Sequence, residues 1–165
     1  MTFSRLVKHL LTSQRQVKKH FSTHCRDNIT SAIRDAEATH MGEIRFAIEA
    51  GLEPGQILRG MTPRERAIEV FSELRVWDTQ HNSGVLIYVL IADRAIEIIA
   101  DRGIDEKNHG DPWRHIADIM QLAFANGQFE AGALSGIAAV TEELTQHFPF
   151  QGNKLNELSN DVAFM

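Results

Sequence analysis

The most constraining feature of this sequence lies in residues 84–101, where two short runs of apolar residues flank a tight polar turn. Residues 85–91 form the first run, residues 92–94 the turn and residues 95–100 the second run. Apolar runs of this length, joined by so few residues, predict two antiparallel strands in a hairpin. Because the first run is apolar on both of its faces, we expect a central strand that is covered on both sides.

The segments around the hairpin predict a helix-rich fold. Helices are predicted over residues 22–40, 62–77, 111–127 and 130–147, a loop over residues 51–61, and a strand with one polar face, close to a sheet edge, over residues 43–50. The first helix is predicted from apolar residues at helical spacing, and the strand is predicted from the alternation of apolar and polar residues. This order of elements predicts an α/β fold, a three-layer α/β/α sandwich with a small mixed β-sheet.

Composition divides the chain into a basic amphipathic N-terminal helix (residues 1–21), a folded domain (residues 22–149) and a flexible C-terminal tail (residues 150–165). The first twenty residues hold five basic residues and no acid, whereas 12 basic and 22 acidic residues remain in the rest. An acidic body argues against nucleic-acid binding. We expect the N-terminal helix to pack on the domain or on a protein partner, with contact to an anionic membrane as the less favoured alternative.

The location of the protein is expected to be cytoplasmic. The single cysteine, Cys25, excludes an internal disulfide. No apolar stretch approaches the roughly 20 residues that span a bilayer. The N-terminus lacks the continuous apolar stretch and the cleavage site of a signal peptide.

Polar side chains mark the predicted strand ends on one edge of the sheet. Glu43 begins the first strand, Asp78 and Asn82 precede the second, and Asp101 follows the third, with Asp105 in the next loop. If the first two strands are parallel, these ends meet. Oxygen donors from several loops are what Ca²⁺ requires, and Mg²⁺ or Mn²⁺ are alternatives. An antiparallel first strand would instead move its carboxylate to the far edge.

The same residues have simpler interpretations. The acids can cap helices, pair with Arg94 or Arg102, or face solvent. His81 is a candidate acid or base near neutral pH, and Arg102 is a candidate contact to a substrate phosphate. No catalytic residue is assigned, because the sequence contains no phosphate-binding loop, nucleophile elbow or dinucleotide-binding glycine pattern.

Several short motifs, taken in order, resemble the TPM domain family over about residues 25–148. They are Gly42-Glu43-Ile44-Arg45, Asn82-Ser83-Gly84-Val85, Asp93-Arg94, Asp101-Arg102-Gly103-Ile104 and Gly127-Gln128-Phe129-Glu130. The resemblance implies an α/β/α sandwich. It also implies a family in which some members look like calcium-binding modules and an acid phosphatase activity has been proposed for plant members. This chain looks like a stand-alone cytoplasmic bacterial form.

Two functions are therefore expected. The first is a non-catalytic TPM module that binds a divalent cation, calcium by preference, and acts through an unidentified protein partner. The alternative is a metal-dependent acid phosphatase-like hydrolase, with a metal-activated water held by Glu43, Asp78 and Asp101. The binding module is favoured, because the sequence shows no second set of basic residues directed at a phosphate.

Overall fold

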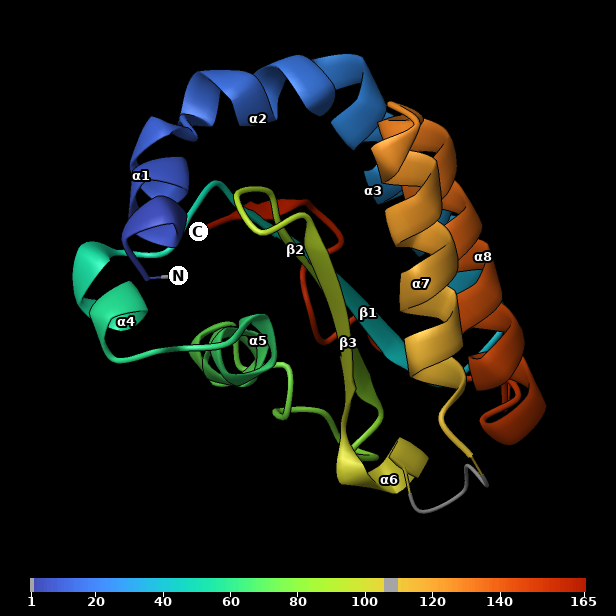
Figure 1. The fold of residues 1–165 in the computed structure, drawn as a ribbon. Helices are drawn as coiled ribbons and strands as arrows, with labels where there is room; N and C mark the ends of the chain where they lie inside the picture. The colour runs from blue at the N-terminus through green and yellow to red at the C-terminus, as the bar shows by residue number, and fades with distance from the viewer. Residues whose placement is uncertain (1, 106–109) are drawn as a thin grey trace.

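The computed structural model describes residues 2–105 and 110–165, and it confirms an α/β fold around a mixed sheet (Figure 1). The strands are β1 (Glu43–Glu49), β2 (Gly84–Leu90), β3 (Ala95–Ala100) and β4 (Ala163–Phe164), in the order β3-β2-β1-β4. β1 is parallel to both β2 and β4, whereas β2 and β3 form the predicted antiparallel hairpin. Helices cover both faces of the sheet, which gives the three layers expected from the sequence.

The helices separate two apolar cores. One core lies under α3 (Thr23–Glu37), α7 (Pro112–Ala125) and α8 (Phe129–His147), and the other under α4 (Pro54–Leu58) and α5 (Pro63–Glu73). Strand β2 supplies both cores. Its residues Val85 and Ile87 face the first core, whereas Leu86 and Tyr88 face the second. Side chains of successive strand residues point to opposite faces, so a strand covered on both sides must be apolar throughout.

The N-terminal segment forms two helices, α1 (Thr2–Leu11) and α2 (Gln14–His20), where one was predicted. Ser13 is the N-cap of α2, and its backbone N–H donates to the side chain of Gln16. This capping box ends one helix and begins the next. With α3, the two helices form a continuous arc along one end of the sheet (Figure 1).

Local backbone geometry corrects two further helix boundaries. The predicted loop over residues 51–61 contains the short helix α4, which Pro54 begins. Helix α5 ends at Glu73, ahead of the predicted residue 77, and Arg75 adopts a left-handed φ of 54° just beyond it. A short helix, α6 (Arg102–Asp105), follows the hairpin. Among the helices of the described residues, none is long and apolar enough to cross a lipid bilayer.

Strand β1 lies inside the sheet, although its polar face predicted a position near an edge. The C-terminal segment, predicted as a flexible tail, pairs with its outer side through Ala47↔Ala163 and Ile48↔Phe164. The exposed backbone groups of an edge strand readily accept such a partner. Both carboxylates of this polar face, Glu43 and Glu49, are also buried, and Glu49 accepts hydrogen bonds from Arg66 and from the Tyr88 hydroxyl. The predicted domain boundaries themselves stay a prediction.

The register brings three strand ends to one edge, as the sequence predicted. Glu43 pairs with Gly84 at the starts of β1 and β2, and Val85 pairs with Ala100 near the end of β3. Residues just outside these positions are therefore neighbours in the fold. The opposite edge holds the hairpin turn and the ends of α1 and α2 (Figure 1).

Candidate functional site

The start of β1 carries a buried carboxylate that already has a cationic partner. Glu43 is 1% exposed, and the Lys154 Nζ atom lies 3.1 Å from its Oε1 atom. The backbone N–H of Leu158 donates to Oε2 at 3.2 Å, and the Lys154 ammonium also donates to the Gly42 carbonyl at 2.6 Å. The chain thus supplies its own positive charge where a metal ion was expected. Sequence reasoning missed Lys154, because it lies in the segment predicted as a tail.

Two further titratable groups lie beside this pair, and we call Glu37, His40, Glu43 and Lys154 the β1 cluster. Burial, reinforced by the negative charge of Glu43, raises the pKa of Glu37 to about 7. Its carboxylate accepts from the Ile44 backbone N–H at 2.8 Å and from an Asn160 side-chain N–H at 2.6 Å. Burial, together with the charge of Lys154, lowers the pKa of His40 to about 4. In the β1 cluster, Lys154 therefore compensates the buried charge of Glu43, whereas the buried ring nitrogens of His40 have no hydrogen-bond partner in the described residues.

Asp78 and His81 lie on the surface of the loop before β2. The Asp78 carboxylate pairs with Arg75 at 3.1 Å, and its side chain is 54% exposed. Asp78 is therefore paired with an arginine, which was one of the simpler interpretations of the sequence. The partner is Arg75, and not Arg94 or Arg102. His81 is exposed as well, and it lines a small cavity of about 120 Å³ together with Glu43 and Lys154. That volume is well below the roughly 300 Å³ of ordinary ligand pockets.

Asp101 and Glu43 each have a buried oxygen without a hydrogen bond in the described residues, but only that of Glu43 has an ion-pair partner there, Lys154. The Oδ1 atom of Asp101 accepts from the Arg102 backbone N–H at 2.8 Å. Its Oδ2 atom is buried and accepts no hydrogen bond from the described residues. Most buried polar atoms in proteins are hydrogen-bonded, so an exception of this kind requires an explanation.

The loop before β2 packs closely against the residues after Asp101. The Gly103 N–H donates to the Asn82 carbonyl at 3.1 Å. A Cβ atom at Gly103 would lie 2.6 Å from that carbonyl oxygen and 2.7 Å from the oxygen of His81, so only glycine fits. Asn82 itself has a left-handed φ of 49°. Asp105 ends α6, and its side chain lies outside the part of the structure that is described.

The five predicted ligands thus share an edge of the sheet by backbone position, but the fold gives their side chains different surroundings. Glu43 is paired with a lysine, Asp78 with an arginine, and Asp101 retains a free oxygen. In residues 2–105 and 110–165, no group of three or more His, Cys, Asp or Glu side chains is placed to hold a metal ion. That these five residues bind one metal ion together therefore stays a prediction.

The N-terminal helix docks at the opposite edge in a way the sequence did not predict. Arg5 and His9 of α1 both contact the Asp93 carboxylate in the hairpin turn, at 2.6 and 3.0 Å. The Leu52 backbone N–H donates to the Nδ1 atom of His9 at 2.8 Å. Burial opposes the charge of Asp93, but the hydrogen bonds from Arg5 and His9 outweigh it and lower its pKa. The polar face of α1 therefore contacts the domain.

Comparison with known proteins agrees with this architecture. The chain is 32% identical to the BA42 protein of the psychrophilic bacterium Bizionia argentinensis, whose NMR structure superposes with a TM-score of 0.77 over 87% of this chain and 94% of that one. The N-terminal domain of a protein from P. gingivalis shares the fold, with 18% identity and a TM-score of 0.59 over 79% of this chain and 82% of that one. No curated protein matches the sequence. The family described as the TPM domain matches residues 16–143, so the chain belongs to the TPM domain family.

Proposed function

We propose that this chain is a TPM-type binding module that takes a divalent cation, calcium by preference, at Asp101 and acts through a protein partner. The observation that supports the cation is the buried Oδ2 atom of Asp101, which accepts no hydrogen bond from the described residues. A buried polar atom without a partner costs about 1–3 kcal/mol. A cation at this oxygen would remove that cost.

The surroundings of Asp101 favour an oxygen-coordinated ion. The carbonyl oxygens of His81 and Asn82 lie against the start of α6, and Asp105 is the nearest additional carboxylate in the sequence. Ca²⁺ prefers six to eight oxygen ligands, and sites with few carboxylates bind it with a Kd of about 0.1–1 mM. Mg²⁺ and Mn²⁺ are the alternative ions. Glu43 is left out of this ligand set, because Lys154 already neutralises it.

An amide NMR titration with Ca²⁺, repeated with Mg²⁺, tests the cation. Saturable shifts are expected around residues 78–82 and 101–105, with a midpoint of about 1 mM. The Asp101→Asn variant should lose them. The Asp78→Asn variant is the matched control, because it removes an exposed carboxylate of the same predicted set, and it should retain them. An unchanged titration in Asp101→Asn, or no shifts at about 10 mM Ca²⁺, would contradict the site.

The protein partner is supported by the outward face of α1. Because the polar face of this helix contacts Asp93, an apolar stripe is left in solvent: Phe3 is 78%, Leu10 64% and Leu11 72% exposed. Contiguous exposed apolar side chains on one helix face are typical of surfaces that bind another protein. The helix contacts the domain through Arg5, His9 and Leu6 and leaves these three apolar side chains exposed.

Two variants separate a partner surface from a nonspecific apolar contact. Leu10→Gln should abolish capture of a partner from the source cell, whereas Leu155→Gln should not, because Leu155 is 81% exposed elsewhere on the surface. Equal loss in both variants would argue against α1 as the interface. Sedimentation with anionic vesicles in place of protein capture would favour the membrane alternative.

The metal-dependent acid phosphatase-like hydrolase is the second candidate. It is favoured by Arg102, whose exposed side chain follows Asp101 directly and whose backbone N–H binds that carboxylate. Hydrolysis of p-nitrophenyl phosphate in the presence of Ca²⁺, Mg²⁺ or Mn²⁺, lost in both Asp101→Asn and Arg102→Gln, would establish it. Cation binding without hydrolysis of the substrate would favour the binding module over the hydrolase.

A further inference from the structure

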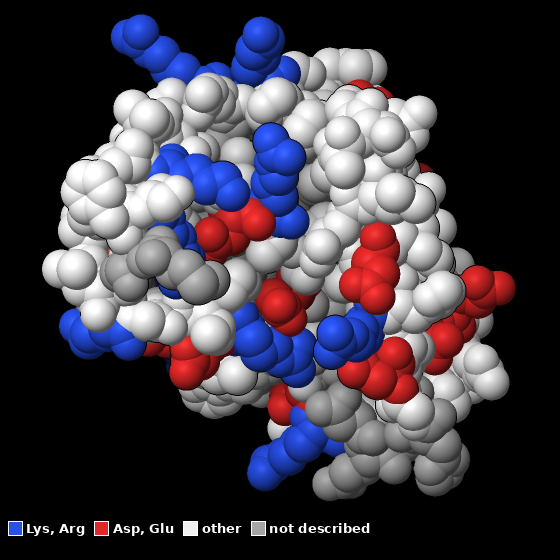
Figure 2. All heavy atoms as spheres, viewed as in Figure 1, with Lys and Arg blue, Asp and Glu red and all other residues white. Residues whose placement is uncertain are grey.

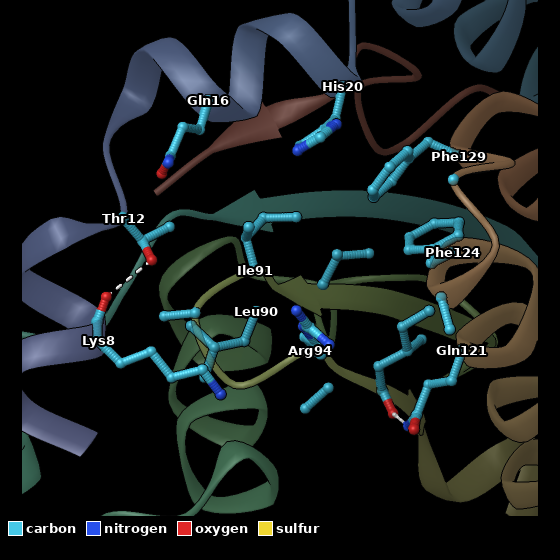
Figure 3. A pocket seen from close by; sticks show the side chains of 16 residues that line it. Lys8, Thr12, Gln16, His20, Leu90, Ile91, Arg94, Gln121, Phe124 and Phe129 are labelled. Carbon is cyan, nitrogen blue, oxygen red and sulfur yellow. Dashed lines mark hydrogen bonds between the residues drawn. The ribbon is translucent and has the colours of Figure 1, made fainter. Parts of the chain in front are cut away.

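A cavity of about 570 Å³ lies outside the predicted site, at the hairpin-turn edge of the sheet (Figure 3). It lies between the N-terminal helices α1 and α2, the turn that joins β2 to β3, and the junction of α7 and α8. Ligand pockets typically measure about 300–1,000 Å³. The cavity is therefore large enough for a small organic molecule.

One wall is a row of polar side chains from the N-terminal helices. Lys8, Thr12, Gln16 and His20 are each four residues apart, and all line the cavity. Residues four apart lie on the same face of a helix. In Figure 3, Gln16 and His20 point into the cavity from above, whereas Thr12 and Lys8 lie along its left side. The break at Ser13 bends the row around the cavity, because α2 begins there with a changed direction.

The opposite wall and the floor are apolar. Phe124 and Phe129 lie with their ring centroids 5.1 Å apart, and the His20 imidazole stacks on Phe129 at 4.2 Å. Leu90 and Ile91 at the end of β2 form the floor (Figure 3). This surface suits a flat or aliphatic group, because rings bind other planar groups by stacking and by apolar contact.

The charge on the cavity wall is positive, although the whole chain has a net charge of −5. Lys8 and Arg94 line it, and no acidic residue of the described chain does. Neither side chain forms an ion pair within the described residues. Asp93, beside Arg94 in sequence, is already bound by Arg5 and His9. Figure 2 shows basic atoms on this face around the region where α1 and the hairpin turn meet, with acidic atoms between them.

We propose that this cavity binds a small organic anion, with its acidic group held by Lys8 and Arg94 and its apolar part against Phe124 and Phe129. Inorganic phosphate would leave the aromatic wall unused, and a neutral apolar molecule would leave both cations without a partner. A carboxylate, sulfonate or phosphate attached to a ring or a short aliphatic chain uses both surfaces. The site is separate from Asp101, which lies at the other edge of the sheet.

A pair of fluorescent probes tests the proposal directly. 1-Anilinonaphthalene-8-sulfonate carries a sulfonate on its ring system, and N-phenyl-1-naphthylamine has the same rings without the charge. The folded protein should bind the anionic probe saturably and the neutral probe at least tenfold more weakly. Amide shifts caused by the anionic probe should be confined to residues 8–20, 89–96 and 121–129. Equal binding of the two probes, shifts centred elsewhere, or no binding of the anion would overturn the proposal.

Matched variants test whether Lys8 and Arg94 hold the acidic group of the probe. Lys8→Gln and Arg94→Asn should each weaken the anionic probe by up to about fivefold, the effect of one solvent-accessible charge pair. Asparagine is chosen at position 94 because the backbone there has a left-handed φ of 52°, which Asn tolerates. Lys18→Gln is the control, since it removes the same charge from an exposed position on α2 that does not line the cavity. A comparable loss in Lys18→Gln would show that net charge, and not the cavity, attracts the probe. Asp101→Asn should have no effect.

Discussion

The two edges of the sheet use charged residues in opposite ways. At the start of β1, the buried carboxylate of Glu43 is compensated by Lys154, and Glu37 is hydrogen-bonded by Ile44 and Asn160. At the hairpin turn, Lys8 and Arg94 line a cavity of about 570 Å³ and have no ion-pair partner in the described residues. A concentration of charge at an edge does not by itself make a site. What matters is whether the fold has already neutralised it.

The difference follows from which segment covers each edge. The C-terminal segment lies against β1 and places Lys154 and Leu158 beside the Glu43 carboxylate and Asn160 beside the Glu37 carboxylate of α3. The N-terminal helices approach the other edge through Arg5 and His9, and a row of four polar residues, Lys8, Thr12, Gln16 and His20, lines the cavity. At the first edge, buried oxygens of both Glu43 and Asp101 accept no hydrogen bond within the described residues, but the Glu43 oxygen lies 3.1 Å from the Lys154 ammonium and the Asp101 oxygen has no such ion pair there.

The largest effect is expected from Lys154→Met, which would break the compensation at the β1 cluster. Removing one partner of a buried ion pair leaves the other charge uncompensated and typically costs about 3–5 kcal/mol. The free energy of unfolding, measured in urea, should fall by that amount. The double variant Lys154→Met with Glu43→Gln should recover part of the loss. A decrease below about 1 kcal/mol would mean that the pair does not hold this edge together.

The pH dependence of stability should expose two opposing groups in the β1 cluster. Between its ordinary value of 4.5 and a folded pKa of about 7, Glu37 keeps a proton that the unfolded chain releases, so its contribution is lost as the pH rises. Between its ordinary pKa of 6.5 and a folded pKa of about 4, His40 stays unprotonated in the folded protein but is protonated in the unfolded chain. Its contribution to the free energy of unfolding is therefore lost as the pH falls. From pH 4.5 to 6.5, the opposite effects of Glu37 and His40 on the pH dependence of the free energy of unfolding nearly cancel.

Single variants should separate these slopes. In Glu37→Gln the His40 slope remains, and the free energy of unfolding should rise by up to about 3 kcal/mol from pH 4.5 to 6.5, since one pKa unit corresponds to about 1.4 kcal/mol. In His40→Asn it should fall over the same range. Urea unfolding at a series of pH values measures both. Parallel profiles for the two variants would contradict the assignment.

A smaller effect is expected from Asp93→Asn, which would loosen the other edge. The carboxylate binds Arg5 and His9, and loss of charge-assisted hydrogen bonds costs about 2 kcal/mol. Amide hydrogen exchange of residues 3–11 should accelerate by roughly 30-fold, while exchange in β2 stays unchanged. Asp118→Asn, an exposed acid on α7, is the control. Uniform acceleration over the whole domain would show that α1 docking is part of global stability.

The smallest effect is expected from Asp78→Asn. The Arg75–Asp78 pair is exposed, and such pairs contribute about 0–1 kcal/mol. The melting temperature should change by no more than a degree or two, in contrast to Lys154→Met at the same edge. A loss comparable to that of Lys154→Met would show that the loop before β2 belongs to the β1 cluster.

Much of the framework was predictable because its signals are local. The two apolar runs of the hairpin and the cap at Thr62 lie within a few residues of the structures they specify. The parallel arrangement of β1 and β2 then placed Glu43 and Asp101 at one edge. The row at residues 8, 12, 16 and 20 was not predicted to line a cavity, because that role depends on the contact of Arg5 and His9 with Asp93, far away in the sequence.

The sequence by itself determined β1, the hairpin of β2 and β3, and the positions of α3, α5, α7 and α8, because apolar periodicity and capping act between neighbouring residues. Its short motifs also resembled the TPM domain family. Only the tertiary structure decided that β1 is interior, that Lys154 neutralises Glu43, and that the polar row of the N-terminal helices faces Phe124 and Phe129. Each of these contacts joins segments far apart in the chain. Whether a charged side chain is buried and paired depends on which distant segment packs beside it in the fold. A local pattern of residues does not determine that packing.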